Sequence, residues 1–140
     1  IGVTGVQTCA LPIFSLSIST SGMIAQRRRL EVASQNLAHQ FTLLDAEGNY
    51  APYERREIVF EPNEQGGVRA AEVRISDAPL RMKFDPTHAF ANADGYVEVP
   101  NVDPVVENLE AMVALRSYQA NAQAAEIGKS MIQTAIELIA

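Results

Sequence analysis

The sequence predicts an α+β protein: long N- and C-terminal helices pair as a coiled-coil-like layer, and a small antiparallel β-unit is inserted between them. Three observations support this fold class. Apolar residues recur every seven positions in Phe14–Leu37, and they do so again in Val105–Ile139. The segment between them holds short β-prone runs separated by glycine and proline. We therefore divide the chain into an N-terminal assembly helix (14–40), a β-rich middle (41–102) and a C-terminal assembly helix (103–140).

Residues 1–13 precede the first helical pattern. By the genetic code, Val3–Ile13 is the in-frame translation of a common sequencing-adapter oligonucleotide, so we expect this segment to be foreign to the fold. A secretory signal is the competing interpretation, but the segment has neither a basic n-region nor a small-residue cleavage site. Cys9 is the single cysteine of the chain, and we assign it no disulfide or thiol chemistry.

Four apolar residues of the N-terminal helix are spaced seven apart, and we call them the N-terminal row: Leu16, Met23, Leu30 and Leu37. This spacing predicts a helix that keeps one side against a partner. Ser19, Gln26 and Ala33 fill the intervening positions, so the helix alone would be marginal in water. Gly22 costs roughly 1 kcal/mol relative to alanine in a helix interior. We interpret it as a point where another helix approaches closely.

The C-terminal helix has a clear start signal, because Asp103 suits the N-cap and Pro104 suits the first helical position. About 36 residues of helix would reach about 54 Å, which exceeds the diameter of a small domain. Arg116 and Asn121 are polar positions that we expect to pair across an interface and fix register. Apolar and small residues form what we call the C-terminal row, and with the N-terminal row they are the predicted assembly interface: Val106, Val113, Ala120, Ile127, Met131 and Leu138.

The sequence between the two helical segments predicts four short strands. Tyr53–Phe60 and Val68–Ile75 are β-prone, and Gly66-Gly67 between them is a turn signal. Leu80–Phe84 and Tyr96–Val99 are shorter candidates, bounded by Asp85-Pro86 and Asp94-Gly95. We expect one small antiparallel unit and no second independent domain.

Charge excludes some classes of partner. The formal net charge is −6, which argues against a nucleic-acid partner because phosphates require clustered cationic surface. No apolar run approaches 18 residues, so no membrane insertion is expected. Residues 14–40 carry three arginines and one glutamate, whereas 103–140 carry five acids and two bases, so opposite charge favours pairing of the two ends. We interpret Arg27–Arg29 as a solvated or subunit-facing stripe.

Few residues suit catalysis. Asp85-Pro-Thr-His88 holds half of a metal site, but no further histidine or cysteine lies near it in sequence, so we interpret it as a turn. Ser21 and Ser34 are not in a strand–turn–helix context with a base, which a nucleophilic serine needs. We therefore predict no enzymatic activity, no metal and no cofactor.

Several stretches resemble the bacterial flagellar rod and hook axial proteins. Ser-Gly-Met-Ile-Ala-Gln-Arg-Arg-Arg (21–29) followed by Ser-Gln-Asn-Leu-Ala (34–38) is similar to a motif shared widely in that family. Phe-Asp-Pro (84–86) and Gly-Tyr-Val-Glu-Val-Pro-Asn-Val-Asp (95–103), with the short middle, most resemble the proximal-rod members. One departure is His39, because the family usually continues Asn-Ile-Ala-Asn where this chain has Asn-Leu-Ala-His (36–39).

The resemblance implies a structural subunit of the proximal rod of the flagellar basal body, without a cofactor. Such subunits polymerise through their terminal helices and transmit torque across the periplasm. The implied partners are other rod subunits, in homo- and hetero-oligomeric assembly, and the flagellar type III export apparatus. The alternative is a soluble coiled-coil adaptor or export chaperone. The β-prone middle and the apolar rows argue against a self-contained chaperone, and concentration-dependent assembly distinguishes the two.

Overall fold

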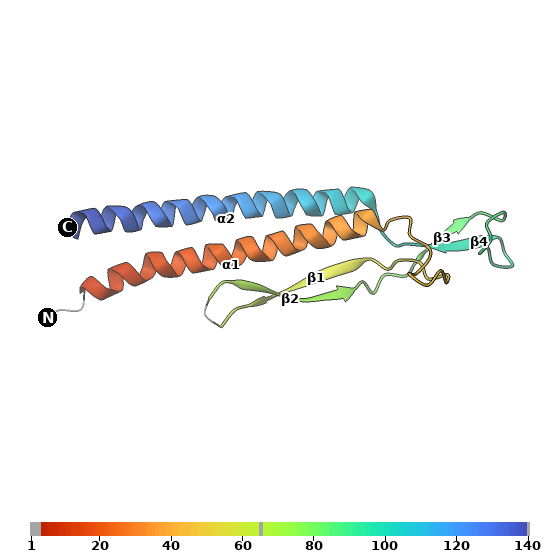
Figure 1. Ribbon diagram of the computed structural model, residues 1–140, viewed down its shortest axis with the longest axis horizontal. Coiled ribbons are helices and arrows are strands. Elements are labelled where there is room, and N and C mark those ends of the chain that lie inside the picture. Colours follow the sequence, from red (N-terminus) through yellow and green to blue (C-terminus); the bar gives the residue numbers. More distant parts are fainter. Residues whose placement is uncertain (1–3, 65, 140) are drawn as a thin grey trace.

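The computed structural model describes residues 4–64 and 66–139, and the side chains of residues 14–64 and 66–138. It confirms the α+β class, with four strands between two long helices. Helix α1 spans Thr4–Ala38 and helix α2 spans Pro104–Ile139. The two helices run antiparallel along each other, and both chain ends lie at the same end of an elongated molecule (Figure 1).

Helix α1 begins at Thr4, well before the predicted start at Phe14. Once a helix has been nucleated, each added residue contributes a hydrogen bond, which favours continuation through the preceding segment. The side chains of residues 1–13 lie outside the described part of the structure. That this segment does not pack as part of the fold therefore stays a prediction. At the other end of the chain, α2 begins at Pro104, which confirms the predicted first helical position.

Strands β1 (Arg56–Pro62) and β2 (Val68–Ile75) form the first hairpin, in which Arg56 pairs with Ile75. The predicted turn is confirmed, since Gly66 and Gly67 have φ of 87° and 89°, a region that favours glycine. The first strand starts three residues later than the predicted Tyr53. The reason is that the Tyr53 amide donates to Thr42 O and the Arg55 amide to the Asn101 side chain, instead of to a neighbouring strand.

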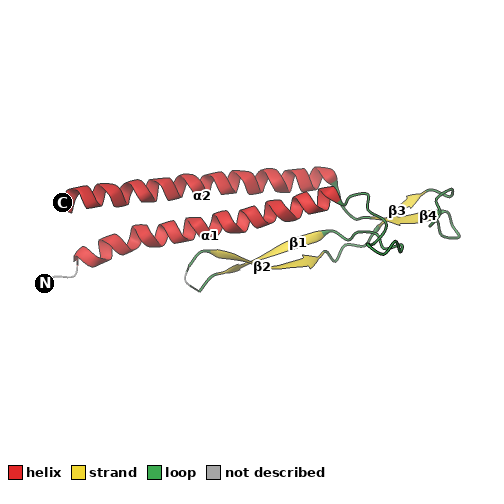
Figure 2. Cartoon of the chain, in the orientation of Figure 1, coloured by secondary structure: helices red, strands yellow, loops and turns green. Residues whose placement is uncertain are grey.

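Strands β3 (Arg81–Phe84) and β4 (Tyr96–Val99) form a second antiparallel hairpin, and β4 has the predicted bounds. The two hairpins are separate two-stranded sheets, and together they make up the small antiparallel β-region that the sequence predicts between the helices (Figure 2). The loop from Asp85 to His88 is a turn, in which the His88 amide donates to Asp85 O at 3.2 Å.

Helix α1 lies between helix α2 and the β1–β2 hairpin (Figure 1). The β1–β2 hairpin lies along α1 on the side opposite α2, while the β3–β4 hairpin projects beyond the helices (Figure 1). The close approach predicted at Gly22 is confirmed, because a Cβ there would lie 2.8 Å from Asn121 Nδ2 on α2. The described core is thin and is made mostly of small side chains: Ala25, Val32, Ala33, Val97, Val102 and Ala114.

Candidate functional site

The C-terminal row lies on α2 to one side of the face that contacts α1, about 60–100° around the helix from it. Its large members are exposed, including Ile127 at 63% and Leu138 at 82%. The face of α2 turned toward α1 is a different set of residues, also spaced by seven: Glu107, Ala114, Asn121 and Gly128. The predicted row therefore does not join the two helices of one chain. It forms a continuous apolar strip along the surface of the helix pair.

The N-terminal row is placed differently. All four of its residues are half-buried, while Ser19 and Ala33 between them are buried against the rest of the chain. Leu30 lines a small cavity of about 180 Å³ between the helices, together with Ala114 and Tyr118 of α2. This row is therefore partly covered within the chain, and the sequence spacing alone did not distinguish it from the exposed C-terminal row.

Asn36 and Glu107 form the centre of a buried polar cluster that the sequence analysis did not predict. Asn36 is 0% exposed and Glu107 is 1% exposed. The Asn36 Nδ2 group donates to Glu107 Oε2 and to Arg56 O, each at 2.9 Å. Asn36 Oδ1 accepts from the Tyr53 hydroxyl and the Arg56 amide, each at 3.0 Å. This side chain joins the last turn of α1, the start of β1 and the first turn of α2.

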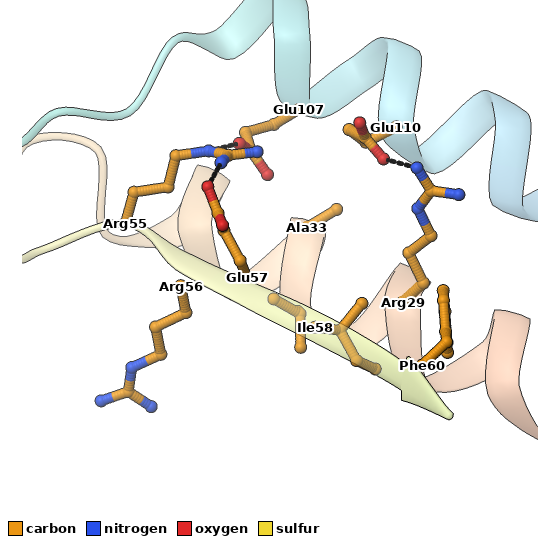
Figure 3. Close-up of a pocket in the computed structure, with 10 residues that line it drawn as sticks. Arg29, Ala33, Arg55, Arg56, Glu57, Ile58, Phe60, Glu107 and Glu110 are labelled. Atoms are coloured by element: carbon orange, nitrogen blue, oxygen red, sulfur yellow. Dashed lines mark hydrogen bonds and ion pairs between the residues drawn. The ribbon is translucent and has the colours of Figure 1, made fainter. Parts of the chain in front are cut away.

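Arg55 extends this cluster, which we call the polar junction (Asn36, Tyr53, Arg55, Glu57 and Glu107). Its Nε donates to Glu107 Oε1 at 2.6 Å and its guanidinium also donates to Glu57 Oε1 at 2.7 Å (Figure 3). Burial is the largest single effect and lowers the pKa of Arg55, but the hydrogen bond to Glu107 and the negative charges of Glu107, Glu57 and Glu110 together outweigh it, so the pKa is raised. A buried charge is tolerated when it is paired and hydrogen-bonded, as Glu107 is here.

An ion pair also links the two helices directly, about one turn along α2 from Glu107. Arg29 of α1 pairs with Glu110 of α2, and both side chains are partly exposed (Figure 3). This contact agrees with the expectation that the opposite charges of the two ends favour their pairing. Arg27 and Arg28, in contrast, are exposed and both pair with Glu31 on their own helix.

The start of α2 is held by the residues that the sequence singled out. The Val105 amide donates to Asp103 Oδ1 at 2.9 Å, which confirms Asp103 as the N-cap. Asn101 accepts from the Arg55 amide and donates to Ala78 O, each at 2.7 Å. The Pro-Asn-Val-Asp segment (100–103) therefore fixes where α2 leaves the β-rich middle.

The residues considered for chemistry have structural contacts. Ser21 Oγ donates to Ile18 O and accepts from the Val68 amide, so it attaches the first hairpin to α1. The Thr87 hydroxyl donates to Asp85 within the Asp85–His88 turn. Over the described residues there is no group of three or more His, Cys, Asp or Glu side chains suited to a metal ion. None of the helices over the same residues is both long and apolar enough to cross a membrane.

Comparison with known proteins gives a consistent result. Residues 93–138 match the family described as flagellar basal body rod FlgEFG protein C-terminal. The chain is 39% identical over 126 residues to the flagellar basal-body rod protein FlgC of Escherichia coli O6:H1, covering 86% of this chain and 92% of that protein. It is 33% identical to the protein of the same name from Bacillus subtilis, covering 89% and 95%. The corresponding Borreliella burgdorferi protein is 32% identical, with the same coverage.

Proposed function

Because this chain belongs to the FlgC family of flagellar basal-body rod proteins, we propose that it polymerises through its terminal helices within the proximal rod. The chain is a structural rod subunit of the flagellar basal body and is not an enzyme. The proposal concerns how it is held there: the exposed C-terminal row packs against neighbouring rod subunits, of its own kind or of others.

The observation that carries this proposal is the exposure of the C-terminal row. Val106, Val113, Ile127, Met131 and Leu138 are all exposed on one side of α2. Burying one such side chain contributes roughly 1.5–3 kcal/mol, so a contact that covered the whole strip would be strongly favourable. A continuous apolar strip of this kind on a single chain is typical of a protein–protein interaction surface.

Torque transmission is supported by the rigidity of the polar junction. A subunit that passes torque must keep its helices and its β-rich middle in a fixed relation. Asn36, Arg55 and Glu107 join α1, α2 and the start of β1 through buried hydrogen bonds. Because these bonds have fixed directions, they resist rotation of one element against another. We infer that the junction holds the β-rich middle at a constant angle to the helical layer.

Export through the flagellar type III apparatus is also part of the proposal. Passage as an unfolded chain requires a fold that opens readily and closes again without covalent crosslinks. The thin core of small side chains and the absence of cysteine after Cys9 both support this route.

Motility of a strain that lacks its own rod gene tests the proposal. The chain should restore swimming, and Ile127→Asp should abolish it, because an unpaired charge in an apolar contact costs more than the lost burial. Gln133→Asp is the matched control, since Gln133 is exposed on α2 outside the C-terminal row. Loss of swimming should accompany loss of rods, with both variants exported equally. Normal rods with Ile127→Asp would contradict the proposed contact.

A further inference from the structure

A groove runs between α1 and the β1–β2 hairpin, on the side of the molecule opposite α2. Its volume is about 540 Å³. Ile24 of α1, which is 65% exposed, and Val68 of β2 give it an apolar floor. Arg27, Arg28 and Arg69 stand at its edges, and we call this feature the hairpin groove.

The edge of the hairpin groove is cationic. Arg27 and Arg28 share one carboxylate, that of Glu31, at 3.2 and 2.9 Å. Arg69 pairs with Glu61 at 2.8 Å. Three guanidinium groups are therefore paired with only two carboxylates. The edge of the groove carries a net positive charge beside an exposed apolar floor. A segment that fills this groove should be apolar along its centre and acidic along its flank.

The C-terminal row of α2 has this chemistry. Its distal half presents Ile127, Met131 and Leu138 as exposed apolar side chains. Glu126 and Glu137 are exposed beside this strip, about 100° and 80° around the helix from Ile127. Lys129 lies about 200° around the helix from Met131, on the other side. The flank of the strip is therefore acidic where the groove edge is cationic.

We propose that the hairpin groove receives the C-terminal row of a second copy of this chain; this rests on the proposed function and assigns the partner of that row. Figure 1 shows α1 between α2 and the β1–β2 hairpin, so the helix that carries the row and the hairpin that borders the groove lie on opposite sides of α1. Each copy can donate its row to one neighbour while its groove holds the row of another. Such a heterologous contact repeats through successive subunits, as an axial assembly requires.

Disulfide trapping tests the contact directly. In a Cys9→Ser background the chain has no other cysteine. Ile24→Cys and Ile127→Cys are prepared separately, mixed as full chains and mildly oxidised. We expect the mixed disulfide in large excess over either self-linked product. Lys83→Cys, on the exposed strand β3, replaces Ile24→Cys in the control and should give none above background. Equal yields from the two mixtures would overturn the proposal.

Charge exchange provides the second test, read as self-association in sedimentation velocity. Arg28→Glu should weaken association about tenfold, since exposed pairs each contribute modestly and the substitution adds repulsion. Glu126→Arg in the same chain should recover most of that loss, while Lys83→Glu should change little. Absence of recovery, or no self-association by a chain that restores motility, would overturn the second copy as occupant and leave the rod function standing. A chain that neither associates nor restores motility would reject the proposed function itself.

Discussion

The two ends of the helix pair are held by different kinds of contact. At the end near the β-rich middle, Asn36 and Glu107 are buried and satisfied by hydrogen bonds from three elements. Toward the chain ends, α2 meets α1 through small side chains, with Gly22 against Asn121 as an example. Several large apolar side chains of α2 are exposed there, including Ile127, Met131 and Leu138. Directional polar bonds fix the first end within one chain, whereas the second end has its apolar surface available for other subunits.

Hydrogen exchange is the broadest test of this difference. In dilute full-length protein, we expect fast exchange in residues 14–35 and 115–140, because helices with little buried apolar surface are marginal. Slower exchange is expected around Asn36 and Glu107 and in the folded middle. Opening free energies should span from near zero at the chain ends to the global value at the junction. Strong protection of both end stretches in a proven monomer would contradict the comparison.

Glu107→Ala should be the most destabilising single substitution at the polar junction. It removes the acceptor of Arg55 Nε and one of the two acceptors of Asn36 Nδ2 at a buried position, and breaking a buried pair in this way costs about 3–5 kcal/mol. Urea unfolding of the monomer measures the change. Glu110→Ala is the control, because the Arg29–Glu110 pair is partly exposed and should contribute about 1 kcal/mol or less. Equal effects of the two substitutions would remove the distinction between buried and exposed pairs.

The sequence predicted the elements better than their partners. The Gly66-Gly67 turn, the strand Tyr96–Val99 and the Asp103 cap were recognisable because each depends on neighbouring residues. Asn36 and Glu107 were missed because they meet across 71 positions, and no local pattern marks two polar residues as a buried pair.

The face of α2 that packs on α1 could not be predicted from the sequence, for a related reason. A seven-residue spacing identifies a helix face but not what covers it. On α2 two such faces coexist, one large and apolar and the other small, including Ala114 and Gly128. The small face packs on α1, because small side chains allow the two backbones to approach closely. Choosing between the faces requires knowing that the partner helix also carries Gly22 at the contact.

Gly22→Ala tests the contact between α1 and α2 toward the chain ends. Alanine is favoured over glycine in a helix by about 1 kcal/mol. Here its Cβ would lie 2.8–2.9 Å from the Asn121 amide, which also donates to Ser117 O at 2.9 Å. We expect a net destabilisation of about 1–2 kcal/mol from the forced displacement of Asn121.

Asn121→Ala supplies the matched background for this test. With the amide removed, Gly22→Ala should become stabilising by about 1 kcal/mol. The double-mutant cycle therefore measures the contact between the two positions. An effect of Gly22→Ala that is the same in both backgrounds would show that the helices do not meet at this point.

Substitutions in the turn of the β3–β4 hairpin, which belongs to neither end of the helix pair, should have the smallest effects on stability and motility. Asp85 accepts from the Thr87 hydroxyl, and the Phe90 amide donates to His88 Nδ1 at 3.3 Å, so both residues serve a surface turn. Asp85→Ala and His88→Ala should each cost about 1 kcal/mol or less in unfolding free energy, because such turn hydrogen bonds contribute modestly. Swimming should be close to that of the unsubstituted chain, with Ile127→Asp as the non-motile reference. Loss of motility from His88→Ala, in a protein that is still exported and stable, would instead require a metal-binding or catalytic role for that imidazole.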